Sequence, residues 1–510
     1  MGNSLLFDGE YEGVNFKNFR YLKDLNVSDV VVRISRGKSQ FKLDELYSER
    51  LMDLNQIYYR QAIFKDMDYD DIYNGISQFS TDIVNLNKAE DSTTRVYNYH
   101  QRNYYKMNEV ALYIDLVERI QKVLQDERII SKGLQTQAAL FTEYVNSSQF
   151  IQMKSELKRV QAALDSIHYS VRITSHGMEV FDKTVDVDYS DVLEETFRRF
   201  KQYDTDSYLY HGFQISIKLN GAEERVLEEV VKFHRDVFAS LGDFADKYKE
   251  YKVQFVLNFY SEIQFYLSYI DFMRPLKKKG MIFSFPVFND DGDYTVEIKN
   301  GFNVAVARNN ETVITNDFVR DAHEDVYVIT GANQGGKTTF ARMVGQIIHF
   351  AQIGAPVAAE YARLFLCTEI LAHFEVDEDV ATENGKLKED LVRVKELLEC
   401  ADERSIFIFN EVFSSTTMED ANVLGVNVIR KIRNIGSICI YVTFLDKIIK
   451  NVPGAVSMVS QTLPDGVRTF KIIRKEADGL SYAMMLAEKY NLTYDQILNR
   501  LNRNAEGGGR

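Results

Sequence analysis

The sequence predicts a mostly α-helical region with a small β-containing tip, followed by an α/β domain with a parallel sheet. Three observations support this fold class. The five prolines of the 510-residue chain all lie at or after Pro275, so earlier helices can run long without a break. Apolar residues in that first part recur with the period of a helix. After Pro275, short continuous apolar runs alternate with helical patterns, as in a buried parallel sheet.

Composition and charge exclude several classes of protein. Apolar residues make up 45% of the chain and charged residues 27%, which argues against disordered and collagen-like proteins. No apolar run approaches the about 18 residues of a membrane-spanning helix, and residues 1–6 lack the pattern of a secretory signal. We therefore expect a cytoplasmic protein. The net charge of −14 argues against a surface that binds nucleic acid throughout, although a local basic stripe is compatible with it.

The spacing of apolar residues before Pro275 predicts two long amphipathic helices with a β pattern between them. The first helix has the heptad rhythm of a helix that packs against a partner at Phe150, Met153, Leu157, Val160, Leu164 and Ile167. The second has the same rhythm at Leu227, Val230, Val237, Leu241, Phe244, Tyr248, Tyr251 and Phe255. Between them, apolar residues alternate with polar ones, as in a half-buried strand, at Phe213, Ile215, Ile217 and Leu219. Further short strands are expected near Val171 and over 184–187.

These patterns predict a helix running out from about Gln137, a tip over about 168–220, and a helix running back from about Ala222 to Met273. The two helices would pair through their apolar seams, and a plain coiled-coil spacer is the alternative. Residues 165–222 contain six basic and ten acidic side chains, a local net charge of −4. A surface that neutralises phosphates needs the opposite sign.

A nucleotide-binding motif follows the apolar strand 326–329. Residues 331–339 read GANQGGKTT, which is the pattern GxxxxGK[ST] between a strand and a helix that starts near Phe340. In such a loop, backbone N–H groups surround phosphate oxygens, the lysine reaches the β- and γ-phosphates, and the hydroxyl binds Mg²⁺. The residues predicted to bind nucleotide are Gly331, Asn333, Gly335, Gly336, Lys337, Thr338 and Thr339.

Two further strands complete the predicted parallel sheet. The first, 405–409, ends in Asn410 and Glu411, at the position where an NTPase holds the Mg²⁺ shell and orients the attacking water. Glu411 fits the role of the base, together with Lys337 as the second catalytic residue, and Asn410 stands at the metal position beside Thr338. The second strand is 438–443. No Asn-Lys-x-Asp signature for guanine follows the motif, so ATP is favoured over GTP.

Several other residues allow both a functional and a structural interpretation. Gln352 could bridge the phosphate and the metal, or it could be an ordinary polar residue at a helix end. His373 is expected to be structural, and Lys277–Lys279 to be a solvated loop unless it contacts a phosphate backbone. The three cysteines have neither CxxC spacing nor a neighbouring His and are expected to be buried free thiols: Cys367, Cys400 and Cys439.

On these motifs, residues 320–500 resemble the ATPase domain of the MutS mismatch-repair family, which belongs to the ABC class of ATPases. The family motif TGPNMGGKST is matched by 330–339, IGxxVPA by 353–359, and DExxxGTSTxDG by the segment that starts at Asn410. The tail at 478–483 resembles the entry to the family's dimerisation helix-turn-helix. The earlier segment 51–61 resembles the start of its helical core, and the two long helices resemble its levers and clamp.

The resemblance implies a homodimer that binds ATP and Mg²⁺ between its ATPase domains, with Asp420 contacting the opposing subunit. It also implies a short form, because the core begins at once where mismatch-recognising members carry a wedge domain and a connector. The Phe-x-Glu at Phe141 and Glu143 lies on an expected lever helix and is interpreted as coincidence. Three polar family positions are altered: the signature Ser is Gly385, the switch His is Phe444 and the metal-site Asp is Asn410.

The expected domains are a helical core (1–134), levers with the clamp-like tip (135–285), an ABC-type ATPase domain (286–475) and a dimerisation segment with the tail (476–510). The expected function is ATP-driven closure of levers on double-stranded DNA in repair, recombination or DNA defence, with weak binding that does not select mismatches. The alternative is an ATP-driven switch that acts on a protein or ribonucleoprotein partner.

Overall fold

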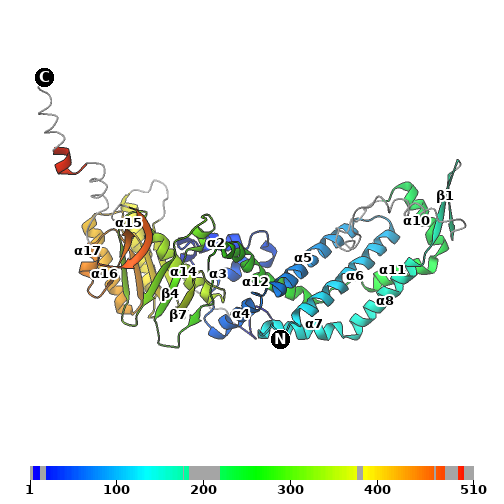
Figure 1. Ribbon diagram of the computed structural model, residues 1–510, viewed down its shortest axis with the longest axis horizontal. Helices are drawn as coiled ribbons and strands as arrows, with labels where there is room; N and C mark the ends of the chain where they lie inside the picture. The colour runs from blue at the N-terminus through cyan, green and yellow to red at the C-terminus, as the bar shows by residue number, and fades with distance from the viewer. Residues whose placement is uncertain are drawn as a thin grey trace, which may run out of the picture. The chain divides into compact units, whose positions relative to one another are not determined.

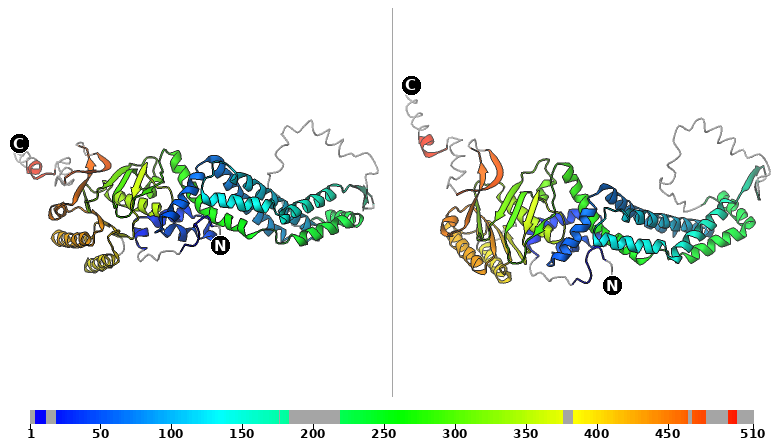
Figure 2. Two further views of the ribbon diagram at one scale, coloured as in Figure 1. Left: turned by 90° about the horizontal axis from the view of Figure 1, so that it is seen from below. Right: turned by 60° about the horizontal axis from the view of Figure 1, so that its bottom comes forward.

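The computed structural model describes residues 4–11, 19–175, 177–182, 219–375, 383–463, 467–476 and 492–498. The chain forms two compact units (Figure 1, Figure 2), one of residues 1–64 with 262–510 and the other of residues 65–261. The divisions fall within helices α4 (Leu54–Asp66) and α12 (Gln254–Lys278). Across the described ranges, no helix is both long and apolar enough to cross a membrane.

A six-stranded, mostly parallel sheet forms the centre of the first unit. Its strand order is β12-β11-β6-β10-β9-β8; β12 is antiparallel to β11, and the other neighbouring strands are parallel. The strands are β6 (Val326–Thr330), β8 (Ile370–Phe374), β9 (Ile406–Asn410), β10 (Ile438–Val442), β11 (Val456–Thr462) and β12 (Arg468–Arg474). The three strands predicted from continuous apolar runs are β6, β10 and β9. They lie side by side with every residue buried, which confirms the prediction.

Helices cover both faces of this sheet, as Figure 1 shows. The helix α14 (Lys337–Gln352) lies on one face, where a Cβ added to Gly345 would come within 2.9 Å of Ile408 Cδ1. On the other face, α15 (Glu383–Cys400), α16 (Met418–Ile435) and α17 (Lys447–Asn451) cover a core that contains Phe407, Phe409, Cys439 and Tyr441. Alternate residues of each strand therefore face opposite helices.

The cysteines are free, as expected. Cys367 and Cys439 are buried, and Cys400 is only partly buried. Burial raises the pKa of the Cys367 thiol to about 12. Such a thiol is inert at neutral pH, because the thiolate is the reactive form.

A second, four-stranded sheet of order β3-β7-β4-β5 belongs to the same unit. Its strands are β3 (Val287–Phe288), β4 (Val296–Gly301), β5 (Asn316–Arg320) and β7 (Tyr361–Leu364). Asn316 joins the two sheets, since its side chain accepts a hydrogen bond from the Ile472 N–H (2.8 Å) and donates one to the Phe470 carbonyl (3.1 Å). Short helices complete the unit: α1 (Tyr21–Asp24), α2 (Val27–Ile34), the 3₁₀ helix η1 (Ser39–Phe41), α3 (Leu43–Ser48) and α13 (Val304–Ala307).

Hydrogen bonds tie one side of α14 to the segment around α1. Arg342 Nε donates to the Asp24 carbonyl (2.8 Å), and Gln346 Nε2 donates to the Leu25 carbonyl (2.7 Å). Gln346 is 1% exposed, so its amide depends on protein partners rather than on water. Residues 21–25 are thus part of the same packed body as the sheet.

The second unit is helical and carries a β-hairpin. Its helices are α5 (Asp70–Thr93), α6 (Tyr99–Leu124), α7 (Lys132–Val145), α8 (Ser148–Asp165), α10 (Gly221–Phe233) and α11 (Arg235–Lys247). The strands β1 (Tyr169–Thr174) and β2 (Gly177–Asp182) pair antiparallel, which confirms the short strand expected near Val171. Phe141 in α7 is fully buried against the rings of Phe79, Phe255 and Phe259. Its role is therefore packing, in agreement with the interpretation of Phe-x-Glu as coincidence.

The predicted pairing of the two heptad helices is confirmed by contacts between α8 and α11. Lys247 Nζ lies 2.6 Å from Glu156 Oε1, and the Tyr248 hydroxyl donates to Glu156 Oε2 (2.9 Å). The expectation of one unbroken outgoing helix is wrong at residues 146–147. There Ser147 ends the run and caps α8 by accepting a hydrogen bond from the Phe150 N–H.

The returning helix expected over 222–273 is also interrupted. His234 adopts φ −119° and ψ 43° between α10 and α11. Between α11 and α12, Tyr251 donates its hydroxyl proton to Glu90 Oε1 (2.6 Å), and the Val253 N–H donates to the Tyr113 hydroxyl (3.3 Å). At Val253 a tertiary partner thus takes the backbone N–H that a continuous helix would pair internally, which the heptad pattern could not reveal.

Some predictions fall outside the described residues. They include the strands at 184–187 and 213–217, most of the acidic tip, and the tail segment at 478–483. Leu219 is described but is not in a strand. The expected four-part division of the chain remains a prediction.

Candidate nucleotide-binding site

The phosphate-loop motif connects β6 to α14, as predicted. Gly336 has φ 93° and precedes the first residue of α14, a conformation that favours glycine. A Cβ on Gly335 would lie 2.1 Å from Ser460 Oγ, which donates a hydrogen bond to the Gly335 carbonyl (2.8 Å). Side-chain packing at Gly335 and the positive φ at Gly336 therefore both favour glycine, apart from any need to approach a phosphate closely.

A cavity of about 320 Å³ lies over this loop. Its lining residues are Asn333, Gln334, Gly335, Gly336, Lys337, Thr338, Thr339, Glu411, Phe444 and Phe470. The volume is at the lower end of the range usual for small-molecule sites. The structure thus brings most of the predicted nucleotide-binding residues together with the predicted base, Glu411. Sequence reasoning missed Phe470, because only the pairing of β12 with β11 brings it to the loop.

Lys337 is buried and held by the loop itself. Its Nζ donates to the carbonyls of Gly331 (2.9 Å) and Ala332 (3.0 Å) and lies 5.2 Å from the centroid of the Phe444 ring. Burial lowers the pKa of the Lys337 ammonium, while Glu411 opposes this change. Gly331 does not line the cavity, but its carbonyl positions Lys337. Because both present acceptors are neutral, anionic phosphate oxygens would compete well for this ammonium.

Thr338 and Asn410 form the predicted metal position. Thr338 Oγ1 donates to Asn410 Oδ1 (2.8 Å), and Asn410 is the last residue of β9. In the described ranges, no group of three or more His, Cys, Asp or Glu side chains is arranged to hold a metal ion by itself. Mg²⁺ prefers oxygen ligands and is commonly bound through a few protein groups together with substrate phosphates and water. The two side chains therefore fit a Mg²⁺ ion that binds together with a nucleotide.

Glu411 lies directly after β9 and faces the cavity. Its backbone has φ 56°, a region that few non-glycine residues occupy and that is common at functional sites. Its N–H donates to the Val442 carbonyl (2.9 Å), which fixes this turn against β10. Burial raises the pKa of the Glu411 carboxyl, while Lys337 acts in the opposite direction. A carboxylate held in this way can accept a hydrogen bond from water in the cavity.

Gln352 is not part of this site, so its assignment to cofactor binding is corrected. It lies at the opposite end of α14 from Lys337, about 22 Å away at 1.5 Å per residue. Its side chain is fully buried, accepts a hydrogen bond from Arg50 Nη1 (3.2 Å) and donates one to the Cys367 carbonyl (2.8 Å). Both the oxygen and the nitrogen of the Gln352 amide are thus engaged in hydrogen bonds inside the protein. The second interpretation, a polar residue at a helix end, is the correct one.

The other sequence candidates have local roles in the structure. Gly385 lies in the first turn of α15 and does not line the cavity. Asp420 lies in the first turn of α16, where its N–H donates to the capping hydroxyl of Thr417 (3.2 Å). His373 is buried in β8 with its Nε2 2.9 Å from Asp390 Oδ1. Lys279 donates to two backbone carbonyls.

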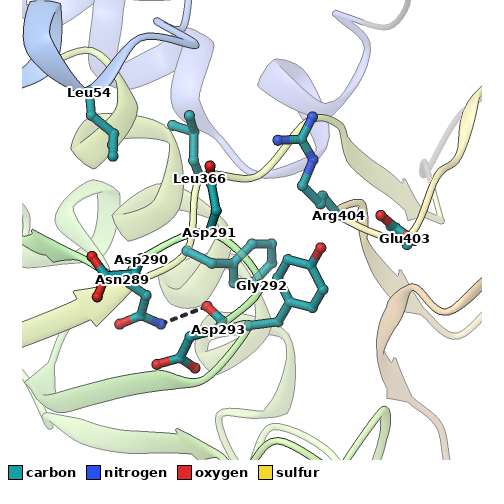
Figure 3. Close-up of a pocket in the computed structure, with 11 residues that line it drawn as sticks. Leu54, Asn289, Asp290, Asp291, Gly292, Asp293, Leu366, Glu403 and Arg404 are labelled. Carbon is teal, nitrogen blue, oxygen red and sulfur yellow. Dashed lines mark hydrogen bonds between the residues drawn. The ribbon is translucent and has the colours of Figure 1, made fainter.

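A second cavity, of about 190 Å³, lies elsewhere in the first unit (Figure 3). Asp290, Asp291 and Asp293 line it together with Arg404. Asn289 Nδ2 donates to the Asp293 carbonyl (3.0 Å), the contact drawn in Figure 3. None of the residues predicted to bind nucleotide lines this cavity.

Comparison with known proteins agrees with this geometry. Residues 327–502 match MutS domain V. Three similar proteins are each named DNA mismatch repair protein MutS. The protein of Thermotoga sp. (strain RQ2) is 22% identical over 425 residues, which is 78% of this chain and 50% of that protein. That of Thermotoga maritima is 25% identical over 295 residues (56% and 35%). That of Carboxydothermus hydrogenoformans is 30% identical over 159 residues (30% and 19%).

The matched region begins in β6 and includes the phosphate loop, Asn410 and Glu411. The chain spans half or less of the length of each of these three relatives. MutS domain V is the ATPase domain of its family. The chain therefore carries an ATPase domain of this type, and most of its length is similar to proteins of the MutS family.

Proposed function

We propose that the chain is a MutS-like ATPase in which ATP and Mg²⁺ bind at the interface of a homodimer and drive closure of the helical levers on double-stranded DNA. The observation that carries the proposal is the convergence of Lys337, Thr338 and Glu411 on one cavity over the phosphate loop. MutS proteins generally form dimers, and the three relatives are named for DNA mismatch repair. Both points support a homodimer that acts on DNA.

The residues that line the cavity would each have a separate role in ATP hydrolysis. Lys337 would leave the carbonyls of its own loop and bind the β- and γ-phosphates, and Thr338 would offer its hydroxyl oxygen to the metal. Mg²⁺, when bound, neutralises negative charge on the phosphates. Glu411 would orient the attacking water and accept its proton. Asn410 holds Thr338 through a hydrogen bond but adds no negative charge, so we expect slow turnover.

Phe444 is a second reason to expect slow turnover. It is 48% exposed and lines the cavity, where its ring lies close to the Lys337 ammonium. A phenyl ring can attract a cation but cannot donate a hydrogen bond to a phosphate, as the histidine expected at this position could.

Lever closure is tested by measuring DNA retention and oligomeric state with and without ATP. We expect ATP to favour the dimer and to increase retention of duplex DNA at low salt, with loss at higher salt because phosphate contacts are screened. Matched and mismatched duplexes should bind equally. A preference of about tenfold or more for the mismatch would contradict this and restore mismatch sensing. An ATP-dependent dimer that retains no DNA at either salt concentration would favour the protein or ribonucleoprotein partner instead.

Asn410→Asp should lower the Mg²⁺ concentration needed for half-maximal ATPase activity. A carboxylate at this position would attract the metal more strongly than the present amide does. The measurement is a Mg²⁺ titration of ATPase activity at saturating ATP. Asn451→Asp, on the exposed end of α17, adds the same charge away from the site and should leave the titration unchanged. An unchanged titration for Asn410→Asp would show that the metal is held without help from this position.

A further inference from the structure

The turn between α5 and α6 carries an unusual set of exposed side chains. Tyr97 is 82% exposed, and Tyr99, the first residue of α6, is 47% exposed. Arg95 and Arg102 are also exposed. The guanidinium of Arg102 lies over the Tyr99 ring, 5.9 Å from its centroid. We call these four residues the α5–α6 surface. It belongs wholly to the second unit and is separate from the nucleotide site.

The backbone of this turn is fixed, so the exposure of Tyr97 is not that of a loose loop. Val96, on one side of it, is 2% exposed. Asn98, on the other side, caps α6 by accepting a hydrogen bond from the Gln101 N–H (3.1 Å). A Cβ on Gly242 of α11 would lie 2.9 Å from the Tyr99 hydroxyl, which shows how closely the two helices pack here. An exposed aromatic ring on a fixed backbone loses little conformational entropy when it binds a partner.

The charge of this surface is opposite to that of the whole chain. Residues 93–108 contain three basic side chains and no Asp or Glu, whereas the chain carries a net charge of −14. Lys106 is already paired with Glu109 (3.1 Å). In the described part of the chain, no carboxylate forms an ion pair with Arg95 or Arg102. The two cations that flank the exposed tyrosines are therefore not neutralised by an ion pair within the described residues.

We propose that the α5–α6 surface binds single-stranded nucleic acid. Exposed aromatic rings stack on unpaired bases, and neighbouring arginines contact the phosphate backbone. The chemistry favours a nucleic acid because the cations lack acidic neighbours in their own segment. It favours a single strand because the largely exposed Tyr97 ring lies in the turn itself, where only a base free of its own stack can lie on it. This inference goes beyond the proposed function and requires no nucleotide.

The test is equilibrium binding of the full chain, without ATP, to a labelled oligothymidylate of about 20 nucleotides and to a duplex of the same length. We expect Tyr97→Ala to weaken single-strand binding about tenfold and Tyr97→Phe to retain it, because stacking needs the ring and not the hydroxyl. Replacing both Arg95 and Arg102 by Ala should weaken binding and reduce its salt dependence. The matched control is Tyr494→Ala, a tyrosine that is 77% exposed in the other unit.

Each outcome decides the proposal. Weaker binding by Tyr97→Ala with wild-type binding by Tyr97→Phe and Tyr494→Ala supports it. Wild-type binding by Tyr97→Ala overturns it, as does a wild-type protein that does not bind the single strand. Tighter binding to the duplex through the same residues would overturn the preference for a single strand. Because Tyr97 is largely exposed, its replacement should not prevent folding, which thermal unfolding checks. Because ATP is absent, failure here is independent of the nucleotide site.

Discussion

Lys337→Ala is expected to abolish ATP binding. The ammonium is the one cation that lines the cavity among the residues described, and a methyl group cannot replace a charge placed between two phosphates. The loss should be about 10²-fold or more in affinity, measured by titration with a fluorescent ATP analogue. Lys337→Met, which keeps most of the side-chain volume, should lose binding as well. This second variant separates loss of charge from loss of packing.

The control for this loss is Lys450→Ala. Lys450 is exposed on α17 and does not line the cavity, so its removal should leave ATP affinity unchanged. If Lys337→Ala kept an affinity within a few-fold of wild type, the phosphate loop would not be the nucleotide site. The cavity over it would then need another ligand.

Glu411→Gln is expected to preserve ATP binding and to slow hydrolysis by about 10²-fold or more. The amide keeps the shape of the side chain but cannot accept a proton from water. Single-turnover hydrolysis, measured beside ATP affinity, separates the two effects. Glu419→Gln, in the first turn of α16, makes the same change outside the cavity and should hydrolyse ATP as wild type does. Unimpaired hydrolysis by Glu411→Gln would exclude this residue as the base.

The pH dependence of hydrolysis gives an independent check on Glu411. Burial raises the pKa of its carboxyl above the ordinary value. Since only the carboxylate can act as a base, the wild-type rate should rise as pH increases through this raised pKa and level off above it. The Glu411→Gln variant should lack this rise.

The parts of the site that could be predicted from sequence are those coded by neighbouring residues. The phosphate loop depends on a strand, glycines and a helix start in direct succession, and Asn410 and Glu411 follow a strand that is apolar throughout. Phe470 could not be found in this way, because it reaches the loop only through the antiparallel pairing of β11 with β12. Gln352 was misassigned for the same reason, since its partner Arg50 lies 302 residues earlier in the chain.

The helical region shows a related limit. The heptad spacing predicted correctly that α8 and α11 pair. Each helix has a row of apolar residues on the face that the pairing buries, and the sequence shows both rows. It did not predict the break around Tyr251, where hydrogen bonds to Glu90 and Tyr113 stabilise a non-helical backbone. Apolar periodicity predicts which face of a helix is buried. It does not predict where a hydrogen bond to another helix interrupts the helical backbone.

The hydrogen bonds between α14 and the segment around α1 set an order for folding. The donors Arg342 and Gln346 lie 318 and 321 positions after their acceptors in the chain. A ribosome adds about 5–20 residues per second. The donors are therefore synthesised roughly 15 to 65 seconds after the acceptor residues 24 and 25. All of the second unit is synthesised during that interval. The body that holds the phosphate loop is therefore begun first and completed last, while the helical unit between its two parts can fold in the meantime.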